Sequence, residues 1–121
     1  DAGFGAGLGR DGAAGCGESV FRAMADAVQV SKLRFKLVRG AGRPLTSAEA
    51  FFLGTKGGGA FFGKVGSLEA GYAFDVIVAD DKNLARPGGL SVEERLERLI
   101  YLSGPEHLRA KYVEGREIFV R

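Results

Sequence analysis

Residues 45–78 read LTSAEAFFLGTKGGGAFFGKVGSLEAGYAFDVIV, and the pattern changes within them from helical to extended. Thr46-Ser47-Ala48-Glu49 is a capping box, in which the Thr hydroxyl bonds the Glu amide and the Glu carboxylate reaches back. We expect a helix to begin there, to stop at the glycines 57–59, and to be followed by a helical turn over 60–62. The β-branched run over 74–80 predicts a strand.

A helix is also expected on the N-terminal side, over residues 18–38, where one face follows the alternating three- and four-residue spacing of a helix. That face comprises Phe21, Met24, Val28, Ser31, Phe35 and Val38. Before it, glycines alternate with Phe4, Ala6 and Leu8. This alternation indicates the end of a buried strand that runs into a loop over residues 10–17.

On the C-terminal side, Ser91 and Glu94 form a second capping box that opens another helix. Residues 110–113 and 116–120 flank Glu114-Gly115, which predicts a β-hairpin closed by a two-residue turn. The apolar face of the expected helix comprises Leu96, Leu99 and Ile100.

The chain therefore divides into a helix-rich part, residues 1–63, and a β-rich part, residues 64–121. Neither part has enough elements to close a sheet or a barrel. A core of this size rarely contributes more than a few kcal/mol, so we expect a piece of a larger fold.

The composition of the chain excludes several classes of protein. The 121 residues are 45% hydrophobic and 26% charged with a net charge of +2, which excludes disordered and collagen-like chains. Neither half is basic enough to predict nucleic-acid binding, and no apolar run approaches the ~18 residues of a membrane span. One cysteine excludes an internal disulfide and indicates a reducing compartment, for which we expect the cytoplasm. One histidine excludes a zinc site built on several imidazoles within the chain.

Two glycine motifs match nucleotide-binding patterns but lack the features that those patterns need. Residues 7–12 fit G-x-G-x-x-G, but a dinucleotide fold needs a full strand before the motif and an acidic residue about 20 positions later. Residues 58–64 fit G-x-x-x-x-G-K, but Val65 stands where Ser or Thr would hold magnesium. A helix end followed by a packed turn is favoured for this second motif.

The basic run over residues 32–39, His107 and Cys16 are weaker candidates for functional residues. A basic run comprises Lys32, Arg34, Lys36 and Arg39. It either contacts phosphate or forms the solvated end of a helix, and the second interpretation is favoured. His107 is expected to be a surface or capping histidine. Cys16 would act as a nucleophile only with groups that the chain does not contain.

Asp11 is the strongest candidate for a functional residue. It follows the expected strand end, and catalytic carboxylates in barrel enzymes lie at the C-terminal ends of strands. An aspartate that only shapes a turn is the alternative. The residues alone favour the second interpretation, an aspartate in a turn.

Several segments, in order, resemble the C-terminal part of bacterial guanine deaminases, members of the amidohydrolase superfamily. Residues 7–11 resemble the pattern G-L-G-[ST]-D, with Arg10 in place of Ser or Thr. Residues 45–58 are similar to L-[ST]-x-x-E-A-[FL]-x-L-[AG]-T-x-G-G, and 65–75 to I-G-[NS]-[FL]-x-x-G-x-x-[AF]-D. Residues 112–116 resemble the closing Y-V-x-G-[RK] hairpin.

The resemblance implies an α/β fold: the last strand and closing helices of a (β/α)8 barrel, plus part of the adjoining small β-sandwich. It implies a hydrolase of purine catabolism, in which a zinc-activated water attacks guanine and xanthine and ammonia form. Asp11 matches the aspartate that ligates zinc and takes the proton of the water. The remaining ligands are expected upstream of Asp1, so the isolated chain should be inactive.

The resemblance also implies partners: a small-molecule purine, the missing N-terminal part of the same protein, and a second copy in a homodimer. Nucleic acid and membrane are not expected. One alternative is a non-catalytic interaction module, and another is an amidohydrolase with a different substrate. In the interaction module, an exposed aromatic patch would drive self-association. The patch would comprise Phe51, Phe52, Phe61 and Phe62.

Overall fold

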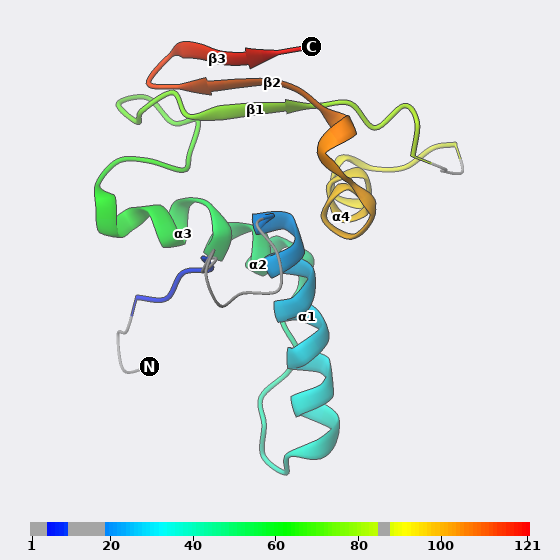
Figure 1. Ribbon diagram of the computed structural model, residues 1–121. Coiled ribbons are helices and arrows are strands. Elements are labelled where there is room, and N and C mark those ends of the chain that lie inside the picture. Colours follow the sequence, from blue (N-terminus) through cyan, green and yellow to red (C-terminus); the bar gives the residue numbers. More distant parts are fainter. Residues whose placement is uncertain (1–4, 10–18, 85–87) are drawn as a thin grey trace.

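The computed structural model describes residues 5–9, 19–84 and 88–121, and its elements form two layers (Figure 1). Helices form one layer, and a three-stranded sheet lies along one side of it. The helices are α1 Val20–Leu37, α2 Ser47–Gly54, α3 Lys56–Gly59 and α4 Val92–Leu102, with 3-10 turns η1 at Ala60–Phe62 and η2 at Pro105–His107. The strands are β1 Val76–Ala79, β2 Leu108–Val113 and β3 Arg116–Val120. In the described residues, the strands all lie after residue 63, together with α4 and η2.

The hydrophobic core lies where α1 packs against α2 and α4. Met24 and Val28 of α1 are each only 2% exposed, and they cluster with Ala50 of α2 and Ile100 of α4. These two α1 residues belong to the face that the three- and four-residue spacing predicts. Burying a side chain of this size contributes about 1.5–3 kcal/mol, so this contact holds the helices together.

The second half of α1 has no such cover. Leu33, Phe35 and Leu37 are all more than half exposed, and Figure 1 shows this end of the helix extending away from the other elements. Apolar side chains therefore continue along α1 past the part of the helix against which other described elements pack. Among the described helices, none is long and apolar enough to cross a membrane.

Both predicted capping boxes are present. The Glu49 amide donates to Thr46 Oγ1 at 3.2 Å, and the Thr46 amide donates to Glu49 Oε2 at 2.8 Å. Ser91 and Glu94 make the same pair of bonds at the start of α4. At α2, Arg43 from the preceding loop adds a hydrogen bond of 2.9 Å to Glu49 Oε2 and pairs with Oε1 as well. The N-terminus of α2 is therefore tied to the loop before it.

This arrangement predicts a dependence of stability on pH. The hydrogen bonds from Arg43 and from the Thr46 backbone lower the pKa of Glu49 from 4.5 to about 2. A lowered carboxyl pKa stabilises the fold above pH 4.5, and that stabilisation is lost as pH falls toward 2. Glu49→Gln should therefore flatten the fall in melting temperature between pH 4.5 and 2. Glu93→Gln, which removes an exposed carboxylate from the first turn of α4, should retain the wild-type slope.

The expectation that the helix stops at the glycines 57–59 is wrong. The chain breaks at Thr55, where φ is −128° and ψ is −102°, and then forms α3 through all three glycines. A helical glycine costs about 1 kcal/mol relative to alanine, so local propensity opposes this helix. Close contacts explain why glycine is needed there, because Gly58 lies against residue 7 and Gly59 against Val65. The expected turn over 60–62 is confirmed as η1.

The sheet is antiparallel with strand order β1-β2-β3. Glu114 and Gly115 join β2 to β3, and both have positive φ, at 49° and 76°. Two positive φ angles are typical of the turn that matches the twist of a hairpin, so the predicted hairpin is confirmed. The amide of Glu114 donates to Asp75 Oδ1 at 2.8 Å, which ties the hairpin turn to the start of β1.

Two features tie the sheet to α4. His107 is only 8% exposed, and its Nδ1 accepts a hydrogen bond of 3.0 Å from the Gly104 amide. Of the two interpretations predicted for His107, capping is confirmed and a surface position is not, because the ring bonds the Gly104 amide and the residue is buried. Just after β1, the buried Asp81 accepts hydrogen bonds of 2.7 and 3.0 Å from the Arg95 guanidinium on α4.

The strand end expected before the loop over residues 10–17 is not formed in residues 5–9, the described part of that segment. A strand needs a neighbouring strand for its hydrogen bonds. The backbone beside this segment belongs to α2, and one bond joins them, from the Leu8 amide to the Leu53 carbonyl at 2.8 Å. The segment lies against the helices.

Candidate functional site

The predicted site residue Asp11 lies outside the described residues, as do Arg10 and Cys16. The structure does describe the segment that leads to it, residues 5–9, and the helix that follows it, α1. What the structure shows of the candidate site is therefore the contacts that these two flanking segments make.

The upstream flank touches α2 and α3 backbone to backbone. A Cβ built on Gly7 would lie 2.5 Å from the Cα of Gly58, and one built on Gly58 would lie 2.7 Å from the carbonyl oxygen of Leu53. Real Cβ atoms do not approach other atoms so closely, so both positions require glycine. The sequence does not predict this contact. It contains the glycines of both segments, but no local pattern pairs them with each other.

The described residues do not fit a metal ion by themselves. Among them, no group of three His, Cys, Asp or Glu side chains lies close enough together to hold one. The Nδ1 of His107 is engaged by the Gly104 amide, so this atom caps a turn. Catalytic zinc needs about three protein ligands, and Asp11 alone would supply one of them.

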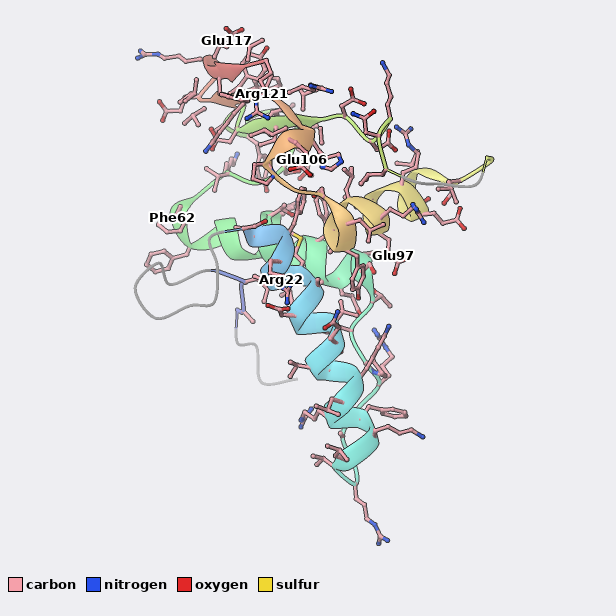
Figure 2. The ribbon with its side chains drawn as sticks, turned by 45° about the vertical axis from the view of Figure 1, so that its right-hand side comes forward. Arg22, Phe62, Glu97, Glu106, Glu117 and Arg121 are labelled. Atoms are coloured by element: carbon pink, nitrogen blue, oxygen red, sulfur yellow. The ribbon has the colours of Figure 1, made fainter. Side chains whose placement is uncertain are left out.

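The motif over 58–64 forms no phosphate-binding loop. Its first residues lie in α3 and its centre in η1, so the predicted helix end is present, but the turn that follows it is not packed. Phe61 and Phe62 pack edge to face at 5.1 Å, and they are 89% and 77% exposed. Figure 2 shows Phe62 pointing away from the helices. Phe52 is also exposed, but Phe51 packs against the core, so the expected patch lacks that residue.

The basic run lies on the exposed half of α1 and the turn after it. Arg34 and Lys36 occupy the last helical turn, where cations complement the helix dipole. Exposed Leu33, Phe35 and Leu37 alternate with these charges, so the surface is not uniformly basic. This position matches the favoured interpretation as a solvated helix end.

A polar cluster fastens the turn after η1 to α3. Lys56 pairs with Glu69, which also accepts a hydrogen bond of 2.7 Å from the Ser67 hydroxyl. The Lys56 ammonium lies 5.3 Å from the centre of the Tyr72 ring. The hydrogen bond from Lys56 lowers the pKa of Glu69 and raises that of Lys56, so both stay charged near neutral pH.

A groove of about 1090 Å³ separates the helices from the sheet. The sequence does not predict this groove, because the alternation of apolar and polar residues in a strand does not show what packs against its apolar face. The groove is open to solvent, and most of its lining is apolar. Residues of both layers line it, among them Phe21, Phe51, Leu68, Val76, Leu108 and Tyr112.

This mixture of helices and strands matches solved structures of guanine deaminases, which have amidohydrolase folds. The crystal structure of the Clostridium acetobutylicum guanine deaminase, with guanine bound in its active site, is 45% identical with a TM-score of 0.86. That match covers 93% of this chain and 27% of the enzyme.

Two further proteins that the chain resembles are also guanine deaminases. The Escherichia coli guanine deaminase structure is 26% identical with a TM-score of 0.77, over 95% of this chain and 27% of that one. A curated guanine deaminase of Dictyostelium discoideum is 29% identical, over 93% of this chain and 26% of its own length. The chain matches no protein-family model. It thus spans about a quarter of the guanine deaminases it resembles, which confirms the expected resemblance and is consistent with their C-terminal part.

Proposed function

We propose that this chain is the C-terminal part of a guanine deaminase, which hydrolyses guanine to xanthine and ammonia. The observation that carries the proposal is the 45% identity and TM-score of 0.86 to a guanine-bound enzyme over 93% of the chain. In this proposal residues 1–63 contribute the last strand and closing helices of a (β/α)8 barrel. Residues 64–121 contribute part of the small β-sandwich beside it.

The surface area supports a larger assembly. A compact monomer of 12.8 kDa has an accessible surface of about 6300 Å². This chain exposes 8834 Å². The excess, about 2500 Å², is comparable with the area buried in an obligate interface. The groove, the exposed half of α1 and the Phe61–Phe62 pair account for apolar surface that the rest of a guanine deaminase would cover.

Asp11 is the residue that we propose for the chemistry. Zinc bound in such a site supplies a nucleophilic water at neutral pH. The carboxylate of Asp11 would hold one position at the metal and accept the proton of the attacking water. The other ligands would come from outside this chain. The whole protein would then be a cytoplasmic homodimer that acts on a small-molecule purine.

The test is a chimaera, in which residues 1–121 replace the matching part of the C. acetobutylicum guanine deaminase. We expect it to form xanthine from guanine, followed by ultraviolet absorbance. The isolated chain, mixed with zinc and guanine, should stay at the level of a buffer blank. A chimaera that melts cooperatively but turns over no guanine would contradict the proposal. Turnover of a different amino-substituted heterocycle by that same chimaera would favour another amidohydrolase.

A further inference from the structure

We propose that His107 is a pH-sensitive switch in the connection between α4 and the sheet. In this inference the neutral imidazole bonds the Gly104 amide, and the protonated imidazole bonds the Glu106 carboxylate in its place. The inference concerns how α4 is joined to the strands, and it does not depend on the reaction proposed above.

One nitrogen atom of His107 faces both partners. The Gly104 amide nitrogen lies 3.0 Å from Nδ1, and Glu106 Oε1 lies 3.3 Å from the same atom. The amide needs a lone pair on Nδ1, whereas the carboxylate needs a proton there. A neutral ring with its proton on Nε2 accepts at Nδ1, but both nitrogens of an imidazolium are donors. The two hydrogen bonds therefore exclude each other, and protonation of the ring selects between them.

The Glu106 carboxylate lies in position for this exchange. It packs over the Gly104 backbone, because a Cβ built on Gly104 would be only 2.7 Å from Glu106 Oε1. The Gly104 backbone is extended, with φ of −122°, so its conformation does not call for glycine. What the missing side chain provides is space for the Glu106 carboxylate beside the His107 ring.

Burial of the ring makes the second partner necessary. His107 is 8% exposed, whereas the Glu106 side chain is 70% exposed. A charge on a buried group is costly unless an opposite charge is hydrogen-bonded to it. Glu106 carries that opposite charge and lies within reach of the ring. Protonation of His107 is therefore compatible with the fold, provided that the ring changes partner.

Other charged groups around η2 are engaged elsewhere. Those on the elements packed around it are Asp80, Asp81, Arg95, Arg109 and Arg121, and those that line the same groove as His107 are Lys56, Asp75 and Lys111. The two aspartates after β1 pair with the arginines of β2 and α4, and Arg121 donates to the Pro105 carbonyl at 3.2 Å. Of the described carboxylates, Glu106 is the one within ion-pair distance of the His107 ring.

The exchange acts on a junction between elements. The His107 amide donates to the Gly104 carbonyl at 3.0 Å, and the His107 carbonyl accepts from the Asp80 amide, after β1, at 2.8 Å. Neither bond involves the ring. Protonation therefore releases the Gly104 amide, two residues after α4 ends, while the link to β1 remains. Because Gly104 and Pro105 line the groove together with His107, this local opening alters the groove wall.

The imidazole sets the pH range of the exchange. Histidine is the side chain that ordinarily changes charge between about pH 5 and 8, and the chain has a single histidine. The hydrogen bond from the Lys82 amide lowers the pKa of Asp80, the carboxyl group next to η2, so Asp80 stays ionised throughout this range. A change at η2 within the range therefore points to His107.

The experiment follows hydrogen exchange of the Gly104 amide in the chain between about pH 7.5 and 5.5, corrected for the intrinsic effect of pH on exchange. Two-dimensional NMR of the ring nitrogens reports the protonation of His107. We expect protection of the Gly104 amide to fall by up to about tenfold as the ring becomes protonated, because one hydrogen bond is lost. The Val28 amide, in the core-facing part of α1, should keep its protection.

The matched variant is His107→Asn, whose side-chain oxygen can accept in place of Nδ1 and does not titrate in this range. Its Gly104 protection should be the same at both pH values. Glu106→Gln removes the charge that the protonated ring needs, so the midpoint of the change should move down by about half a pH unit. Glu117→Gln, on exposed β3, should leave the midpoint where it is in the wild type.

The inference would be overturned by constant Gly104 protection while the ring becomes protonated, or by a ring that stays neutral down to about pH 5. An equal loss of protection in His107→Asn would also overturn it. The same comparison in the chimaera uses exchange of the peptide over residues 103–108, where effects of other histidines cancel between wild type and His107→Asn. Faster exchange of this peptide in the wild type at about pH 5.5 is expected, and equal exchange in the two proteins would contradict the switch.

Discussion

Replacing Asp11 with asparagine in the chimaera is expected to lower kcat for guanine by about a thousandfold, because general base catalysis contributes 10²- to 10⁴-fold. The asparagine amide is close in shape to the carboxylate. It carries no charge and accepts no proton, so both proposed roles of Asp11 are lost together. The measurement is xanthine formation at saturating guanine, with the zinc content of the purified variant determined beside it.

The matched control is Glu117→Gln, which removes the charge of an exposed carboxylate on β3. Surface substitutions away from the core usually change stability by less than about 0.5 kcal/mol, so we expect turnover within twofold of the wild type. If Asp11→Asn kept more than a tenth of the wild-type kcat, Asp11 would be an aspartate that only shapes a turn.

The second large effect concerns stability. Met24→Ala is expected to lower the free energy of unfolding by about 3 kcal/mol, within the 2–5 kcal/mol range for such changes in cores. Met24 is 2% exposed and contacts α2 at Gly54, so its loss opens a cavity at the centre of the helical layer. Urea unfolding of the chain, followed by circular dichroism, measures the change.

Met24→Leu is the control, since it conserves volume and should cost less than about 1.5 kcal/mol. Val30→Ala offers a second comparison, because Val30 lies on the same helix but is 62% exposed. It should be close to neutral in the isolated chain. Equal effects of Met24→Ala and Val30→Ala would show that the helices do not pack as described.

The elements that the sequence predicts well are those decided within a few residues. Each capping box joins two side chains three positions apart, and the hairpin turn depends on two adjacent residues that adopt positive φ. The start of α2, the start of α4 and the β2–β3 turn could therefore be predicted. The helical spacing of α1 is equally local, although it could not show that only half of its face is covered.

The features that the sequence does not predict depend on distant residues. The need for glycine in α3 depends on close contacts with residue 7 and Val65, which no local pattern pairs. The strand end expected before residue 10 is not formed in residues 5–9, because no strand of the described residues lies beside them. The inward position of His107 depends on how η2 is packed. Asp11 itself was identified through family resemblance, since a single carboxylate near a strand end fits two interpretations.

The most direct test of the central claim is to read the coding DNA upstream of Asp1. If the chain is the C-terminal part of a zinc-dependent guanine deaminase, the reading frame should continue upstream. It should encode a His-x-His pair, two further histidines and an acid–base glutamate. An unrelated sequence or an in-frame stop codon directly upstream would leave Asp11 without the remaining ligands, which would contradict the proposed function.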